Sequence, residues 1–379
     1  MDFTLTEEQQ QFGEALRRWI AKDYSFDARR RIIHSASGVS DLAWDTLVEL
    51  GMTALPVPQA QGGFDGSAVD LMVVMQELGR GLVVEPYWAT VLGAQFLKLA
   101  GGKEALLARL ANGQLKLACA LTEKHARYDL NDVTTIASVN GEGYLIDGSK
   151  TVVVHGGQAG AFVVSARSSG AQRDCNGISL FVVPADADGV TVRDYRTIDG
   201  QRAATVTFAN VALPPVALLS RLGAGWDILD AAADYGATLL CAEAVGAMDA
   251  IFAATLDYVK TRQQFGAPIG RFQALQHRMA DMYIHIEQAR SMAMLAAVKV
   301  ASESVEERRR TVSAAKARVG QAARFVGQQA VQLHGGMGVT DELPAAHHFK
   351  RLTMIDLTLG DVDYHLERFI AQPGFQHAA

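Results

Sequence analysis

One stretch of the sequence decides the fold: TRQQFGAPIGRFQALQHRMADM, residues 261–282. Around it, apolar residues recur at steps of three and four, which predicts long amphipathic helices on either side. Between these helices, Arg262, Gln264 and Phe265 stand in a turn that combines a cation, an amide and an aromatic ring. Taken alone, such a turn is interpreted as a connector between two helices with a capping Arg, and a second motif is needed to make it a candidate binding element.

The composition is that of an ordinary globular protein with more than one domain. The chain has 379 residues, of which 49% are hydrophobic and 20% are charged. A single core seldom serves a chain of this length, so two or three domains are expected. The net charge is −6, and the one basic run, EERRR at 306–310, is typical of a solvated helix face. A nucleic-acid-binding role is therefore not expected.

Cysteine usage and the N-terminus indicate a cytoplasmic protein. Cys119, Cys175 and Cys241 are far apart and form no CxxC motif, so neither a zinc site nor a disulfide framework is expected. The opening MDFTLTEEQQQ (1–11) is polar and acidic and predicts no signal peptide. No stretch of about 18 uncharged apolar residues occurs, so no membrane span is expected.

The texture of the sequence changes twice, which predicts domains at 1–112, 113–218 and 219–379. The first is helical, with Thr6 as the expected cap of the first helix and Gly79 as the expected end of a later one. The third is helical again. No GxGxxG follows a strand and no P-loop lysine pattern occurs, so a nucleotide cofactor must be held in another way.

The middle segment is rich in Val, Ile, Thr and Phe, in short runs that are typical of strands. The Asp147–Gly148 pair stands between two apolar runs and predicts a two-residue hairpin turn. We expect a β-barrel or a β-sandwich here, and an α+β fold for the chain. The runs lie at 144–155, 161–167, 178–185, 190–195 and 203–213.

Together with AVQLHGGMGVTDELPAAHHFKRL (330–352), the stretch 261–282 resembles the acyl-CoA dehydrogenase family of flavoproteins. The segment 49–80 is similar to the N-terminal domain of that family, and the resemblance covers essentially the whole chain. It implies an N-terminal helical domain, a middle β domain and a C-terminal four-helix bundle. It also implies FAD-dependent α,β-dehydrogenation of an acyl-CoA thioester by a tetramer, with electrons passed to an electron-transfer flavoprotein.

In the family, the RxxFG and QxHGG segments bind the adenine and pyrophosphate of an FAD that belongs to a neighbouring subunit. Arg262 offers a fork of donors to a pyrophosphate, and Phe265 offers a flat face to adenine. The resemblance therefore assigns nine residues to FAD: Arg262, Gln264, Phe265, Gln273, Gln332, Gly335, Gly336, Thr122 and Gly360. The adjacent His347 and His348 point apart, and no metal site is expected.

The chain lacks both of the usual catalytic bases of the family. Leu359 stands where a Glu is expected, and Gly236 and Ala237 stand at the alternative base position and its following Arg. Two carboxylates are candidates for a relocated base. Glu243 shares a helical face with Gly236 but lies about 10 Å further along, so a packing role is the favoured interpretation. Asp361 follows Leu359 by two residues and is expected to point elsewhere.

The middle domain departs from the family pattern as well. Thr122 and Glu123 match, but Arg127 and Tyr128 replace a small Gly-Ser pair near the acyl-CoA. The segment 152–154 reads Val-Val-Val where the family has Trp-Ile-Thr, so no side-chain donor is offered to flavin N5. We interpret Arg127 as a surface residue rather than a partner for the distal carboxylate of a dicarboxylic acyl-CoA. His155 is similarly interpreted as a strand-end residue rather than an acid.

Features that serve a neighbour's FAD are kept, whereas those that serve the chain's own flavin ring and substrate are lost. The chain thus resembles the small or accessory subunit of a heteromeric acyl-CoA dehydrogenase, such as that of pimeloyl-CoA dehydrogenase. Two alternatives stay open. The chain is a complete catalyst with a relocated base, or it is an oxidase-type or hydroxylase-type flavoenzyme on the same fold.

Overall fold

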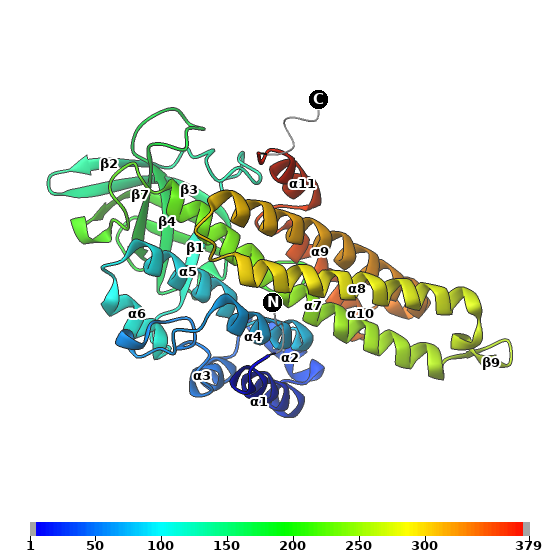
Figure 1. Cartoon of the computed structure of the whole chain (residues 1–379). Coiled ribbons are helices and arrows are strands. Elements are labelled where there is room, and N and C mark those ends of the chain that lie inside the picture. The colour runs from blue at the N-terminus through cyan, green and yellow to red at the C-terminus, as the bar shows by residue number, and fades with distance from the viewer. Residues whose placement is uncertain (1–4, 374–379) are drawn as a thin grey trace. The chain divides into compact units, whose positions relative to one another are not determined.

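A computed structural model describes residues 5–373 and confirms the expected fold class of helices, a β domain and a C-terminal helical bundle (Figure 1). Residues 1–4, part of the polar N-terminal stretch, lie outside the described residues. The helices of the first segment are α1 (Glu7–Asp23), α2 (Phe26–Ile33), α3 (Asp41–Glu49), α4 (Ala68–Gly81), α5 (Tyr87–Ala100) and α6 (Glu104–Ala111), with a 3-10 turn η1 (Gln59–Gln61).

Two expectations for the helix ends have different outcomes. Thr6 caps α1 as predicted, in a capping box in which its side chain accepts from the Gln9 amide and the Gln9 side chain accepts from the Thr6 amide. The prediction that Gly79 ends α4 is wrong. The helix continues to Gly81, and Leu82 leaves it with a left-handed φ of 52°. Gly79 serves close packing instead, because a Cβ there would lie 2.1 Å from the Glu243 carbonyl oxygen.

All seven strands of the middle segment belong to one mixed sheet that branches at β4. The path β1-β4-β2-β3-β7-β6 is hydrogen-bonded throughout, and β5 also pairs with β4. The five predicted runs became β3 to β7, whereas β1 and β2 were not predicted. The strands are β1 (Leu117–Ala120), β2 (Ile136–Asn140), β3 (Gly143–Val154), β4 (Ala161–Arg167), β5 (Ile178–Pro184), β6 (Val190–Arg196) and β7 (Arg202–Leu213), with 3-10 turns η2 (Gly156–Gln158) and η3 (Pro215–Ala217).

The hairpin predicted at Asp147–Gly148 is wrong. Both residues lie inside β3, where the pairing with β7 shifts register between Ile146 and Gly148. The hairpin turn lies instead between β2 and β3, with Asn140 paired to Gly143 and Gly141 at a φ of 59°. The two residues of this turn are therefore Gly141 and Glu142, and a Gly at the first position of a two-residue loop is typical of a type II′ hairpin turn. The Gly of the Asp-Gly pair marks a β-bulge, which is the other common role of a glycine in a strand.

The last segment contains four longer helices and a short final one. Along α8, Met279, Met282, Ile286 and Ala289 are buried, as their helical spacing predicts, and Leu275 is half-buried. The elements are α7 (Trp226–Thr261), β8 (Gln263–Gln264), β9 (Ala267–Pro268), η4 (Ile269–Arg271), α8 (Gln273–Lys299), α9 (Val305–His334), η5 (Gly335–Val339), α10 (Pro344–Leu357) and α11 (Val362–Ile370).

Internal contacts divide the chain into two compact units. The bundle unit combines Met1–Arg31, Ala68–Val83 and Ala237–Ala379, and the sheet unit combines Ile32–Ser67 and Val84–Gly236. This division differs from the predicted boundaries after residues 112 and 218, which stay a prediction. The sheet unit has its own core, in which Phe162, Phe181 and Phe208 pack among aliphatic side chains.

Helix α7 is long and apolar enough to cross a membrane by length and composition alone. Of its most apolar 18-residue window, 67% is buried inside the protein, and buried core helices pass the same test. This one helix is therefore weak support for a membrane span, and the expectation of none stays a prediction.

Candidate active site

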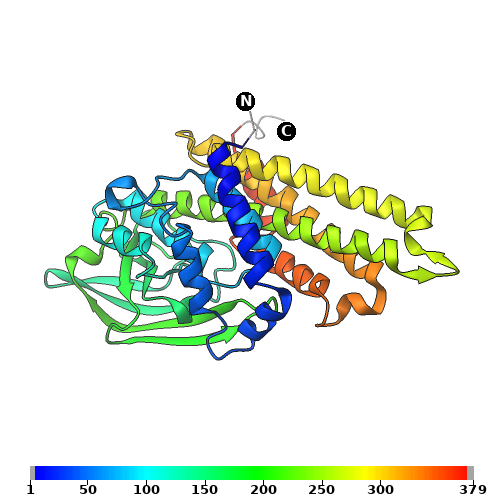
Figure 2. The same cartoon turned by 90° about the horizontal axis from the view of Figure 1, so that it is seen from below.

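The turn between α7 and α8 is a short β-hairpin at one end of these two long helices (Figure 2). Strand β8 pairs antiparallel with β9. The two residues at the tip, Phe265 and Gly266, have φ values of 54° and 76°, as a tight hairpin turn requires. This conformation suits Gly but strains Phe265, and Phe265 is 92% exposed, so burial does not compensate the strain. Such a residue is a candidate contact for a ligand or another chain.

Tyr258 joins this hairpin to the second motif. Its ring stacks on the ring of His334, with centroids 4.5 Å apart and planes 29° apart. Its hydroxyl lies 3.4 Å from the His334 carbonyl oxygen. The backbone carbonyl of Tyr258 also accepts a hydrogen bond from the Arg262 amide, just past the end of α7. His334 is the last residue of α9. The two motifs, distant in sequence, therefore lie side by side in the bundle unit.

The glycines that follow His334 face open space. Gly335 has a φ of 60°, and no atom lies within 4 Å of a Cβ built at Gly335 or at Gly336. Gly338, in contrast, packs closely, because its Cβ would lie 2.5 Å from the Val331 carbonyl oxygen. The first two glycines therefore leave the backbone accessible to a ligand without serving the chain's own packing.

The seven residues assigned to FAD in the C-terminal segment share one property: all are exposed. None is used to fill the core of the bundle unit, so each is available for a ligand or a neighbouring chain. They are Arg262, Gln264, Phe265, Gln273, Gln332, Gly335 and Gly336.

In the sheet unit, a β-bulge in β3 is hydrogen-bonded to Thr122. The pairing of β3 with β7 shifts register between Lys150 and Val153, and the Thr151 amide donates to the Thr122 carbonyl at 2.8 Å. Val152 at the bulge has a φ of 51° and is 51% exposed. A β-branched residue is strongly disfavoured in this conformation, which marks the bulge as a strained candidate site.

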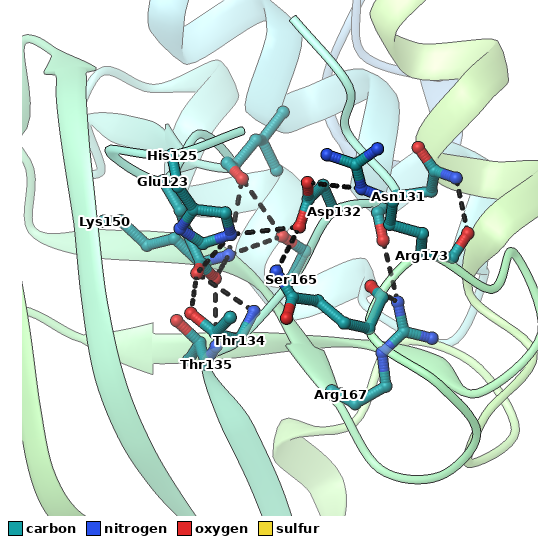
Figure 3. Close-up of polar contacts among 12 residues, drawn as sticks. Glu123, His125, Asn131, Asp132, Thr134, Thr135, Lys150, Ser165, Arg167 and Arg173 are labelled. Carbon is teal, nitrogen blue, oxygen red and sulfur yellow. Dashed lines mark hydrogen bonds and ion pairs between the residues drawn. The ribbon is translucent and has the colours of Figure 1, made fainter. Parts of the chain in front are cut away.

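The loop that follows Thr122 is anchored on a buried ion pair (Figure 3). Lys150 Nζ donates to Glu123 at 2.8 Å and to Ser165 at 3.0 Å, and Glu123 also accepts from Thr134 and Thr135. Burial would raise the pKa of Glu123, but Lys150 and these hydrogen bonds outweigh it and hold the pKa at about 2. Burial lowers the pKa of Lys150 to about 8.

A second set of contacts holds the far side of the same loop. Asp132 accepts from His125 at 3.0 Å, from Gln172 at 2.6 Å and from Arg173 at 2.8 Å. Arg167 donates to four backbone carbonyls of the facing loops, those of Asn131, Gln172, Asp174 and Asn176. Between these anchors the loop presents Arg127, exposed at a φ of 48°, with its guanidinium 5.2 Å from the Tyr128 ring. This geometry agrees with the interpretation of Arg127 as a surface residue.

Leu359 itself cannot take a proton, but the turn that carries it is held by a buried cation, Lys316. Lys316 Nζ donates to the carbonyls of Ile355 at 2.9 Å, Asp356 at 2.9 Å and Gly360 at 2.7 Å. Burial lowers the pKa of Lys316 to about 8. Leu359 has a φ of 56°, and its carbonyl accepts from His365 Nε2 at 2.9 Å. The ammonium thus supplies donors to two carbonyls in the last turn of α10 and to one just beyond it.

Both candidate carboxylates have structural partners in the bundle unit. Glu243 accepts two hydrogen bonds from Arg351, at 2.6 Å from Nε and 2.8 Å from Nη2, and both side chains are buried. Asp361 caps α11 by accepting the Tyr364 amide at 3.0 Å. Both oxygens of the Glu243 carboxylate are therefore engaged by the Arg351 guanidinium. This geometry agrees with the packing interpretation of Glu243.

The remaining positions discussed from the sequence are also structural. His155 lies at the end of β3, with Nε2 2.7 Å from Gln201 Oε1. The Gly236 carbonyl accepts from the Trp88 indole at 3.1 Å. Sequence reasoning did not find Tyr258, Lys316 or Arg351, because a lone Tyr, Lys or Arg in a helix carries no signal of a distant partner.

Comparisons with known proteins agree with this arrangement along the whole chain. Residues 6–114, 118–211 and 223–372 match the N-terminal, middle and C-terminal domains of acyl-CoA dehydrogenases. The probable acyl-CoA dehydrogenase YngJ of Bacillus subtilis is 31% identical over 353 residues, which cover 90% of this chain and 91% of that protein.

Two solved structures are similar to this chain in fold. Butyryl-CoA dehydrogenase from Megasphaera elsdenii has a TM-score of 0.88 at 27% identity, covering 97% of this chain and 98% of that one. The ChsE4–ChsE5 complex from Mycobacterium tuberculosis has a TM-score of 0.87 at 25% identity, covering 97% of each chain. The chain therefore belongs to the acyl-CoA dehydrogenase family, whose members are oxidoreductases that act on CH–CH bonds.

Proposed function

We propose that this chain serves the FAD-dependent α,β-dehydrogenation of an acyl-CoA thioester, with electrons passed to an electron-transfer flavoprotein, as a subunit of a homo- or heterotetramer. The observation that carries the proposal is the Tyr258–His334 stack, which holds two exposed motifs together at one end of the bundle unit. Both motifs match the segments that bind FAD in the family. A cytoplasmic location is part of this proposal.

The residues present fit the adenine and pyrophosphate half of FAD. The exposed Phe265 ring would stack on adenine, and the Arg262 guanidinium would pair with the pyrophosphate. Open space beside Gly335 and Gly336 leaves room for the backbone to approach a phosphate. Gln264, Gln273 and Gln332 would add amide contacts. When bound, FAD supplies the acceptor for the hydride that leaves the substrate.

At the flavin-ring end, Thr122 and Gly360 are the proposed contacts within this chain. Thr122 is half-buried and tied to the β3 bulge, and Gly360 is held by Lys316. Of the three valines of the bulge, Val153 is buried in the core, whereas Val152 and Val154 are not. Neither of these two side chains can donate a hydrogen bond.

A second candidate function is that of a half-site subunit, which completes a partner's FAD site but lacks a base of its own. Three observations favour it. Leu359 carries no proton acceptor, Glu243 is paired with Arg351, and Asp361 caps α11. The similarity to a chain of the ChsE4–ChsE5 complex, a structure with two named components, supports the assembly of a chain of this fold with a different partner.

The test is the visible absorption spectrum of the chain purified alone, measured together with its native mass. One FAD per chain in a homo-oligomer, bleached by an acyl-CoA, would support a complete catalyst and overturn the half-site role. A colourless or half-occupied protein that takes up FAD only with a homologous, base-bearing chain would support the half-site role. Oxygen consumption during turnover would favour an oxidase-type enzyme. Absence of FAD under all these conditions would overturn the proposal.

A further inference from the structure

A buried arginine in α2 is linked through a histidine in α10 to the segment Gly335–Asp341, which is called the cofactor segment below. Arg29 is 1% exposed and donates from Nε to the Leu82 carbonyl at 2.8 Å. Its Nη1 lies 3.0 Å from Nδ1 of His347. Because a guanidinium can only donate, Nδ1 must accept, and the proton of the neutral imidazole must sit on Nε2. Nε2 lies 3.0 Å from the Asp341 carbonyl oxygen and donates to it.

The surroundings of His347 favour this neutral form. Burial lowers the pKa of His347, and the charges of Arg29 and Lys350 lower it further, whereas the Asp341 carbonyl and carboxylate act in the opposite direction. The Asp341 carboxylate lies 3.3 Å from Nε2 and is also paired with Lys350 at 3.1 Å. The Phe26 ring packs edge-on against the imidazole, with centroids 4.9 Å apart.

Two further charged or titratable groups stand near this pair. Burial would raise the pKa of Asp341, but the hydrogen bond from Lys350 and the nearby charges, Arg30 among them, lower it. The neighbouring His348 is fully buried, and burial, followed by Arg29, His347 and Arg80, lowers its pKa to about 3. His348 is therefore neutral under ordinary conditions, which leaves His347 as the imidazole that can change charge at mildly acidic pH.

Asp341 follows η5, the segment that begins with the two open glycines. Burial fixes this segment only in part: Gly338 is buried, but Met337 is 44% exposed and Val339 is 71% exposed. Locally, Thr340 bonds only back to the Met337 carbonyl, through its amide and its hydroxyl. The bond from His347 to Asp341 thus ties the end of the segment to a buried group.

We propose that Arg29, acting through neutral His347, is a positioning residue that fixes the segment Gly335–Asp341 for binding of the FAD diphosphate. Its role in FAD binding rests on the function proposed above. Protonation of His347 would put a proton on Nδ1, which faces the Arg29 guanidinium, and would break the hydrogen bond between these two side chains. The segment is therefore held at neutral pH and released as the pH falls.

The first measurement is hydrogen exchange of the backbone amides of residues 335–343 in the full chain, which needs no FAD. The variants are Arg29→Met, which removes the donors, and His347→Asn, which keeps an acceptor near Arg29 but is too short to reach Asp341. Arg31→Met, on the exposed face of the same helix, is the matched control. We expect exchange to rise about tenfold in the first two, the effect of losing one buried hydrogen bond, and to stay unchanged in the control.

The second measurement is the rate of FAD release from the assembled oligomer between pH 5 and pH 8. Burial lowers the pKa of His347 from the ordinary histidine value of about 6.5, so we expect the rate to rise in the wild type only at pH values below that value. In His347→Asn it should be about tenfold faster at neutral pH and lose most of this pH dependence, because asparagine does not titrate.

Unchanged exchange in the folded His347→Asn variant would overturn the proposal, and this variant decides the matter if Arg29→Met does not fold. Faster exchange with unchanged FAD release would overturn the role in cofactor binding. If no variant and no wild-type oligomer binds FAD, the function proposed above fails, while the exchange rates still decide whether Arg29 positions the segment.

Discussion

The carboxylate of Glu243 and the guanidinium of Arg351 meet in two hydrogen bonds, of 2.6 and 2.8 Å, inside the bundle unit. They join α7 to α10, and both residues are buried. A buried pair of this kind contributes little net stability compared with apolar residues, but it places two helices in a defined register. Here it fixes α10, which connects the cofactor segment to the turn that carries Leu359.

Removing one partner of this pair should destabilise the chain strongly. Glu243→Ala leaves the Arg351 guanidinium buried without its counter-ion, and we expect a loss of about 3–5 kcal/mol in the free energy of unfolding, measured by urea denaturation. The double variant Glu243→Leu, Arg351→Met removes both charges and should lose much less than the sum of the single variants. A loss below about 1 kcal/mol in Glu243→Ala would show that the carboxylate is free for another role.

Lys316 should make the free energy of unfolding increase with pH in the alkaline range. Burial lowers its folded-state pKa from 10.5 to about 8, so between these values the unfolded chain binds more protons than the folded chain. Stability from this group therefore rises with pH over that window, by up to about 3 kcal/mol. The measurement is the free energy of unfolding of the wild type minus that of Lys316→Met, followed from pH 7 to pH 10. A difference that stays flat or falls with rising pH would contradict this prediction.

Arg262 should matter for the cofactor and not for folding. Its side chain is exposed, so Arg262→Ala should change the free energy of unfolding by less than about 0.5 kcal/mol. Loss of a charge-assisted pair with the diphosphate should weaken FAD retention about tenfold in the assembled oligomer. Arg271→Ala, an exposed arginine just beyond the hairpin, is the control and should retain FAD. Wild-type flavin content in Arg262→Ala would remove this residue from the site.

The strained bulge in β3 should be relieved by glycine. Val152 has a φ of 51° and is half exposed, so Val152→Gly removes the strain of a β-branched residue and loses little burial. We expect the free energy of unfolding to rise by about 1 kcal/mol. Val154→Gly, two residues on and without a positive φ, is the matched control and should lower it by about 1 kcal/mol. Destabilisation by Val152→Gly would mean that the valine side chain makes a contact that outweighs the strain.

Local sequence patterns predicted helix caps and buried helix faces correctly, because these depend only on residues close together in the sequence. Thr6 caps α1 because its hydroxyl meets an amide three residues away, and the apolar spacing of α8 matches its buried face. The same reasoning failed at Asp147–Gly148 and at Gly79. In both cases a glycine was interpreted as a chain reversal or a stop, whereas it serves a bulge or a close helix contact. The side chains alone do not distinguish these uses, because each depends on a partner elsewhere in the chain.

The sequence by itself determined the fold class, the two motifs assigned to FAD and the lack of a glutamate at Leu359, because these depend on residue identity, local spacing and resemblance. The tertiary structure alone decided how the motifs meet and what the buried charges do. The stack of Tyr258 on His334, the cation Lys316 beneath the Leu359 turn and the relay from Arg29 through His347 join residues far apart in the chain. Such contacts are set by how helices pack, and no local spacing records them.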